Sequence, residues 1–275
     1  MSGLQKIIKY LAIAFAVYLI FSIITTLMYG VSSIGKFLSN NKSSVVDNLS
    51  DLEINDNALL LDINVKSSNI KIKRGNDFKA ETNSKYINSK QDNNKLYISE
   101  KDHNYLNNDN IELVIYIPED YIFDYVSIDA GAGKVYIEEL STKKLDLDLG
   151  AGKLEAKNLL VTDDFELSGG VGDLIINDSN INNLDADLGL GKFEMISKLT
   201  GNNKIDSGVG KVDLKLVGTL EDYQISLDSG VGRASLGDLK MEDGNTYGSG
   251  INKLDINGGL GSIDIMFLEE NKVGE

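Results

Sequence analysis

Apolar and polar residues alternate along most of the chain from Leu60 onward, which predicts β-strands with one buried face. Between residues 145 and 149, for example, leucine alternates with aspartate, and a strand places successive side chains on opposite faces. After residues 150–152 the apolar positions move from odd to even numbers, at Leu154 and Ala156. The Gly-x-Gly at 150–152 therefore predicts a bulge or corner that turns the chain and resets its inward face.

This Gly-x-Gly corner recurs about every 20 residues, usually with a cation after it. Self-similarity at such a period is typical of a solenoid, in which each repeat buries its apolar face against its neighbours. The sequence therefore predicts an all-β fold, a parallel β-solenoid of about 20-residue rungs. The copies begin at Gly131, Gly150, Gly170, Gly189, Gly208 and Gly230, with a weaker copy at Gly250 and a last one at Gly259.

A long uncharged run precedes the repeats. No charged residue lies between Tyr10 and Gly35, which is long enough for a helix to cross a bilayer. A cleaved signal peptide is the alternative, but its apolar core is usually about 7–15 residues. We expect a transmembrane helix at 10–29, with the amino terminus in the cytoplasm beside Lys6 and Lys9 and the acidic remainder outside. The predicted location is the cell membrane, as a single-pass, extracytoplasmic protein.

The remaining boundaries follow from composition and alternation. Residues 1–9 form the cytoplasmic terminus, and the small polar residues of 30–54 predict a stalk. Residues 55–124 contain shorter, less regular strands and are expected to form an amino-terminal β cap. Residues 125–268 form the solenoid rungs, with Ile263, Ile265 and Phe267 expected to finish the core, and 269–275 form a polar tail.

Composition and motifs exclude several kinds of chemistry. The formal net charge is −15, so nucleic acid is a poor partner. The Gly-x-Gly-Lys segments lack the earlier glycine, the following Ser or Thr and the helix of a phosphate-binding loop, so we expect no nucleotide site. There is no Cys, and the one histidine, His103, lies in a polar loop where we expect it to be solvated. We expect no enzyme activity, no catalytic residues and no cofactor.

Two charged columns flank the corners. Calcium is an alternative for stacked aspartates, but each has an opposite charge five residues on and few second ligands. We therefore expect solvated charge ladders that face each other across the corner, and no metal site. The acidic members are Asp129, Asp148, Asp187, Asp206 and Asp228, interrupted at Ser168 and Gly248; the basic members are Lys134, Lys153, Lys192, Lys211, Arg233 and Lys253.

Roughly residues 55–268 resemble a bacterial family of β-strand-repeat proteins labelled as adhesins by inference from their shape. The resemblance rests on DAGAGK, DLGAGK, DLGLGK and DSGVGK, on IELVIYIPEDY, and on LDINVKSSNIKIKRG. It implies a non-enzymatic, membrane-anchored, extracytoplasmic solenoid that acts as an adhesin-like or scaffold surface protein. Another envelope protein or a surface polymer would be the partner. The alternative is an envelope sensor or regulatory partner of another membrane protein.

Overall fold

The computed structural model describes residues 49–55, 57–103, 110–228 and 230–269. The predicted cytoplasmic terminus and transmembrane helix, most of the predicted stalk, and the polar tail after Glu269 lie outside these ranges. Within them, no helix combines the length and the apolar character needed to cross a bilayer. Residues 46–275 form one compact unit, and the described core lies entirely inside it. This segment can therefore be studied as a separate fragment.

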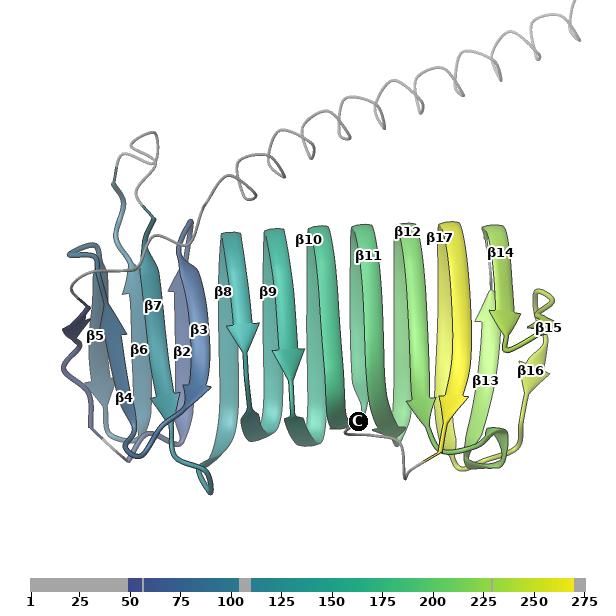
Figure 1. Cartoon of the computed structure of the whole chain (residues 1–275), viewed down its shortest axis with the longest axis horizontal. Coiled ribbons are helices and arrows are strands. Elements are labelled where there is room, and N and C mark those ends of the chain that lie inside the picture. Colours follow the sequence, from purple (N-terminus) through teal and green to yellow (C-terminus); the bar gives the residue numbers. More distant parts are fainter. Residues whose placement is uncertain (1–48, 56, 104–109, 229, 270–275) are drawn as a thin grey trace, which may run out of the picture. The chain divides into compact units, whose positions relative to one another are not determined.

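The described strands form one 17-stranded sheet that winds into a solenoid, as Figure 1 shows. Long bent strands form single-piece rungs: β8 (Ile122–Ile137), β9 (Leu140–Lys157), β10 (Leu159–Asn182), β11 (Leu184–Thr200), β12 (Asn202–Val217) and β17 (Asn252–Leu268). Other rungs consist of two strands: β2 (Leu60–Val65) with β3 (Asn69–Arg74), β6 (Lys95–Glu100) with β7 (Glu112–Ile117), and β13 (Tyr223–Asp228) with β14 (Val231–Leu236). Neighbouring rungs are parallel.

The predicted change of inward parity at the corner is confirmed. In β9, Leu145, Leu147 and Leu149 are buried on the first arm of the rung, and Leu154 and Ala156 are buried on the second arm. Residues 150–152 lie between the arms at the bend. Since each rung repeats this arrangement in register with its neighbours, the apolar side chains of both arms form one continuous core.

The second glycine of each corner is required by close backbone packing. Gly191 has a φ of 149°, and a Cβ atom there would lie 1.8 Å from the carbonyl oxygen of Gly172 in the preceding rung. No side chain fits such a gap, and an L-residue rarely adopts that φ. The same position is glycine in register across the stack, at Gly133, Gly152, Gly172, Gly191, Gly210, Gly261 and Gly232.

Asparagine side chains stabilise the second bend of the rung, which lies opposite the Gly-x-Gly corner. Asn183 has a φ of 48°, a left-handed conformation that asparagine tolerates better than most residues. Its Nδ2 donates to the carbonyl oxygen of Asp163 at 3.0 Å, and its Oδ1 accepts from the N–H of Asn202 at 2.9 Å. Asn203 is buried and accepts from the N–H of Leu184 at 3.0 Å. Side-chain amides thus satisfy backbone groups where the strand ladder is interrupted.

The order of the rungs in space differs from their order in the sequence at the carboxyl end. β17 pairs with β12 on one side and with β13 and β14 on the other, so the last rung of the sequence lies inside the stack (Figure 1). Ile263, Ile265 and Phe267 therefore do not finish the core as expected. The corner of β17 is Gly259-Leu260-Gly261, whereas the expected weaker corner at Gly250 lies before β17.

The amino-terminal end is interleaved in the same way. Within residues 55–124, β2 pairs with β8 on one side and with β6 on the other, and β3 likewise lies between β8 and β7. This range therefore contains two parallel rungs as well as capping strands. Short antiparallel strands cover both outermost rungs, which protects them from edge-to-edge pairing. They are β1 (Ser50–Asp51), β4 (Lys79–Thr82), β5 (Ile87–Asp92), β15 (Leu239–Lys240) and β16 (Thr246–Tyr247).

Replacement of a corner glycine should destabilise the fold far more than removal of the adjacent cation. We expect Gly191→Val to cost about 1–3 kcal/mol from backbone strain alone, with the clash against Gly172 added to it. Lys192→Ala should cost about 0–1 kcal/mol, because it removes only an exposed ion pair. Thermal and urea unfolding of the fragment 46–275 measure both. Equal losses for the two variants would contradict the close-packed corner.

Engineered cysteines can test the interleaved order, because the chain has none of its own. Lys204 of β12 is in register with Asp255 of β17, which is in register with Ser226 of β13. Adjacent rungs lie about 4.8 Å apart, within disulfide range, whereas two rungs span about 9.6 Å and exceed it. We expect Lys204→Cys/Asp255→Cys to form a disulfide and Lys204→Cys/Ser226→Cys not to. The opposite result would support sequential stacking.

Candidate functional site

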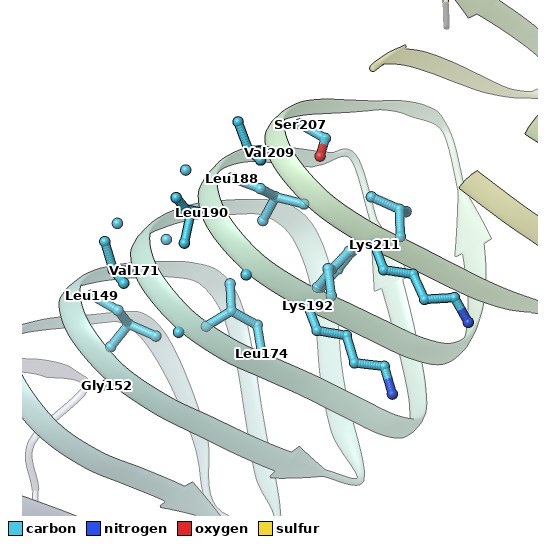
Figure 2. A pocket seen from close by; sticks show the side chains of 17 residues that line it. Leu149, Gly152, Val171, Leu174, Leu188, Leu190, Lys192, Ser207, Val209 and Lys211 are labelled. Atoms are coloured by element: carbon cyan, nitrogen blue, oxygen red, sulfur yellow. The ribbon is translucent and has the colours of Figure 1, made fainter. Parts of the chain in front are cut away.

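The Gly-x-Gly corners place a row of apolar side chains on the outside of the solenoid. The residue between the two glycines stands in register in every rung from β8 to β14. Figure 2 shows three of them, Val171, Leu190 and Val209, in a row across successive rungs and apart from the row of Lys192 and Lys211. We call this row the corner ridge; it consists of Ala132, Ala151, Val171, Leu190, Val209, Leu260 and Val231.

The corner ridge is accessible to solvent. Val231 is 69% exposed and Leu260 is 39% exposed, while Val171, Leu190 and Val209 are half-buried. Glycines on both sides add no side chains that could cover them. The ridge is therefore an apolar stripe that crosses the rungs in the direction of the stack.

The acidic column lies on the first arm, two residues before each corner. Asp129, Asp148, Asp187 and Asp206 occupy the predicted column, and Ser168 interrupts it as expected. The interleaved β17 adds one change, because Asn257 stands between Asp206 and Asp228. Gly248, the second expected interruption, instead follows β16 outside the column and has a φ of 78°. We keep the name acidic column for Asp129, Asp148, Ser168, Asp187, Asp206, Asn257 and Asp228.

A shallow groove runs along the acidic column, over the residues that directly precede the corner ridge in each rung. It has a volume of about 640 Å³ and runs across β9, β10, β11, β12 and β17. Asp148, Asp187 and Asp206 line one side, and Leu149 and Leu188 contribute apolar surface. Its floor is the backbone of the first corner glycines, so a ligand could approach the main chain closely.

The local environment shifts the pKa of two members of the acidic column. Partial burial raises the pKa of the Asp129 carboxyl, and the neighbouring charge of Asp148 raises it further. The opposite holds for Asp206, whose pKa is lowered chiefly by the hydrogen bond from Lys204. The Nδ2 of Asn257 also donates to Asp206, at 2.6 Å. Stacking of carboxylates therefore carries an electrostatic cost that individual donors relieve locally.

The lysines after the corners do not form the predicted ladder with the acidic column. Lys211 lies 2.7 Å from Asp213, two residues further along the same strand face, and 3.6 Å from Asp264 of the next rung. Lys153 pairs with Glu155 at 3.5 Å, and Lys192 pairs with Glu194. The expectation was wrong because the corner turns the two arms apart, whereas residues two apart on one strand share a face.

Five expected members of the basic column are in register, while Lys253 is not, and two other residues interrupt the column. Asp173 and Ser262 occupy its positions in β10 and β17. Lys253, which was expected to belong to it, lies instead at the start of β17, in register with Asn202 and Gln224. The column consists of Lys134, Lys153, Asp173, Lys192, Lys211, Ser262 and Arg233.

The interior under the corner offers little room for a ligand. A cavity of about 20 Å³ lies there, lined by Leu149, Leu174, Leu188, Phe193, corner glycines and the ridge residues Val171, Leu190 and Val209, with Lys192, Ser207 and Lys211 at its polar side. That is space for about one water. Among the described residues, no three His, Cys, Asp or Glu side chains are grouped so that they could hold a metal ion.

Sequence reasoning did not predict the buried carboxylate of Glu100, which lies at the amino-terminal end of the stack. Glu100 accepts hydrogen bonds from the N–H groups of Lys66 at 2.8 Å and Ser67 at 3.0 Å, and from the hydroxyl of Ser68 at 2.9 Å. His103 was expected to be solvated, but its side chain is only 4% exposed and its Nε2 lies 3.2 Å from Glu100 Oε1. The ring also packs edge-on against Tyr86.

This cluster closes the corner stack. Residues 66–68 stack on the Gly-x-Gly at 131–133, where the N–H of Ala132 donates to the carbonyl oxygen of Lys66 at 2.8 Å. They stand where other rungs have glycines, and Glu100 from the next rung satisfies their donors. Both serine hydroxyls donate to the carboxylate, and these donors hold the pKa of Glu100 below its ordinary value, which makes it a weak proton acceptor. The only sequence signal was the serine pair at a corner position.

The family match covers the same rungs. Residues 60–249 match the model of the family described as Toastrack DUF4097, which is more than half of the chain. The chain belongs to this family. In this Toastrack chain the matched range ends just before β17, the strand that the structure places between β12 and β13.

Comparison with individual proteins adds the following. No curated protein matches the Toastrack chain. One similar solved structure is described as a "putative cell adhesion protein" from Clostridium sporogenes ATCC 15579, with 15% identity, a TM-score of 0.37, and coverage of 80% of this chain and 100% of that one. Another is described as a "putative adhesin" from Bacteroides fragilis NCTC 9343, with 14% identity, a TM-score of 0.43, and coverage of 79% and 96%.

The Glu100 cluster should make stability depend on pH in the acid range. Burial raises the pKa of Glu100, but the donors of Ser67, Lys66 and Ser68 outweigh it and hold the pKa below its ordinary value. The stabilisation is therefore complete above the unfolded-state pKa of about 4.3 and is lost as the pH falls through the folded-state pKa.

We expect Glu100→Gln to cost about 1–3 kcal/mol at pH 7, because buried donors lose a charged acceptor. The difference in melting temperature between wild type and variant should shrink at about pH 3. Glu166→Gln, on the exposed face of β10, is the matched control and should change the melting temperature little. A gap for Glu100→Gln that stays constant down to pH 3 would show that the charge of Glu100 does not stabilise the corner.

Proposed function

We propose that the chain is a membrane-anchored, extracytoplasmic, non-enzymatic solenoid that acts as an adhesin-like or scaffold surface protein. The observation that carries this proposal is the corner face, on which the groove, the ridge and the charged columns extend across many rungs in register. A surface that repeats along one axis suits a long or multivalent partner better than a small molecule.

The chemistry of the described residues supports a binding role. The groove is shallow, and its described lining combines carboxylates with the hydroxyls of Ser168 and Ser207 but contains no histidine. The cluster that does combine serine, histidine and glutamate is buried and organised to hold a turn. Transition-state stabilisation needs preorganised donors around a reacting atom, and nothing on this face provides them.

The sequence supports the membrane anchor. The uncharged run from Tyr10 to Gly35 is long enough to span a bilayer, and two lysines precede it. A long acidic domain after a first helix is ordinarily translocated. The solenoid would then face outside the cytoplasm, where its corner face could reach a partner.

Cysteine labelling tests this topology, since the natural chain has no thiol. In intact cells, a membrane-impermeant maleimide should label Lys204→Cys, which is on the exposed face of β12, and should label Ser2→Cys only after permeabilisation. The reverse pattern would contradict the orientation. Recovery of the protein in the soluble fraction would contradict the anchor.

Partner capture separates this proposal from a sensor or regulatory role. A surface protein should bind a cell-wall or host polymer through the solenoid, and the fragment 46–275 should retain that binding. A regulatory partner of a membrane protein should instead co-purify in detergent with a stoichiometric membrane protein, in a manner that depends on residues 10–29. The second result would replace the adhesin-like role.

A further inference from the structure

The corner ridge leaves apolar surface in water along the stack. Leu260 and Val231 are exposed, and Val171, Leu190 and Val209 are half-buried. A contiguous row of this kind on a soluble domain is typical of an interaction site. Glycines flank the row on both sides, so the positions next to it in the described rungs carry no side chain that could shield it. The partner must therefore present apolar groups along a line.

The first arm, beside the ridge, is acidic and therefore favours a partner with positive charge. On the first arm, the positions two and four residues before each corner hold nine carboxylates and the single ammonium of Lys204. Neighbouring carboxylates lie about 4.8 Å apart across the rungs and repel by about 1 kcal/mol even in water. Besides the acidic column, the carboxylates are Asp146, Glu166, Asp185 and Asp255.

The second arm cannot supply the complementary cations from another copy of the chain. Lys192 and Lys211 are already paired with Glu194 and Asp213 of their own rungs, and Arg233 with Asp264. A second copy would thus bring an arm that is internally neutralised. The charge complementarity favours a different molecule that carries Lys or Arg, and it disfavours nucleic acid and anionic lipid.

The spacing of the rungs favours a helix over an extended segment. Ridge side chains repeat about every 4.8 Å, and a helix parallel to the stack advances about 5.4 Å per turn. Because the two spacings are similar, one apolar side chain from each helical turn can contact one ridge side chain over three or four successive rungs. Same-face side chains of a strand are about 6.6–6.8 Å apart. They no longer coincide with the ridge side chains after two rungs. The ridge and the acidic column are three residues apart, so at most about 10 Å separates them, and one helix of about 10–12 Å diameter can contact both.

We propose that the groove along the acidic column, together with the corner ridge beside it, docks a cationic amphipathic helix of a partner protein. Its apolar stripe lies on Val171, Leu190 and Val209, and its Lys or Arg side chains reach Asp148, Asp187 and Asp206. This inference rests on the proposed function, because the partner must meet the solenoid on the same side of the membrane.

A synthetic peptide of about 18 residues, made only of Leu and Lys with helical periodicity, is the probe. It is titrated calorimetrically into the fragment 46–275, whose cooperative melting is checked first for each variant. We expect saturable one-to-one binding that weakens with salt. Asp187→Asn/Asp206→Asn and Leu190→Ser/Val209→Ser should each weaken it by about tenfold or more.

Matched controls separate this surface from general charge attraction. Glu194→Gln/Asp213→Asn removes the same charge on the second arm and should change the dissociation constant by less than about threefold. A peptide of the same composition with alternating Leu and Lys should bind at least about tenfold more weakly. Equal binding of the two peptides, or equal effects of all three variants, would overturn the proposal.

Two further outcomes would assign the surface to another occupant and would also overturn it. Self-association of the fragment that Leu190→Ser/Val209→Ser abolishes, seen by sedimentation, would assign it to a second copy. Tighter binding of a chitosan oligosaccharide than of the helical peptide would assign it to a cationic polymer. The titration does not depend on membrane topology, so its failure and the failure of the cysteine labelling are distinguishable.

Discussion

The structure depends on the contact of backbone with backbone at the Gly-x-Gly corner. A Cβ atom on Gly191 would lie 1.8 Å from the carbonyl oxygen of Gly172, and one on Gly210 would lie 1.7 Å from that of Gly191. Each rung can bend sharply there and still stay paired to both neighbours. The corner thereby fixes the register of the two arms, because a shift by one residue would bring a side chain into the gap and turn the apolar face outward.

Register then arranges every exposed side chain into a column, which concentrates like charges. On the second arm, Lys153 and Lys211 are neutralised by acids two residues further along the same strand, Glu155 and Asp213. On the first arm, relief is local and comes from single donors such as Lys204 and Asn257 beside Asp206. The two arms therefore differ in charge although they share one core. The first arm is acidic, whereas the charges of the second arm are largely neutralised by ion pairs.

The two ends of the stack have the same arrangement of rungs and capping strands. At each end a two-piece rung stands outermost, covered by short antiparallel strands, and the rung nearest the chain end in sequence lies one place inside. Antiparallel cover interrupts the parallel edge that would otherwise recruit another chain. At the amino-terminal end, Glu100 also satisfies the donors of the serine corner, so a charged acceptor continues a stack that glycines form elsewhere.

The sequence by itself determined the β-solenoid, the position of each corner from 131 to 232 and the inward face of each arm. These follow from local periodicity and from glycine, whose effects act within one rung. Only the tertiary structure decided that β17 stands between β12 and β13, that His103 is buried against Glu100, and that the lysines pair along their own strand. These features depend on which rungs meet across long separations and on the direction in which each arm faces. A repeat cannot encode either one, because its rungs look alike to every possible neighbour.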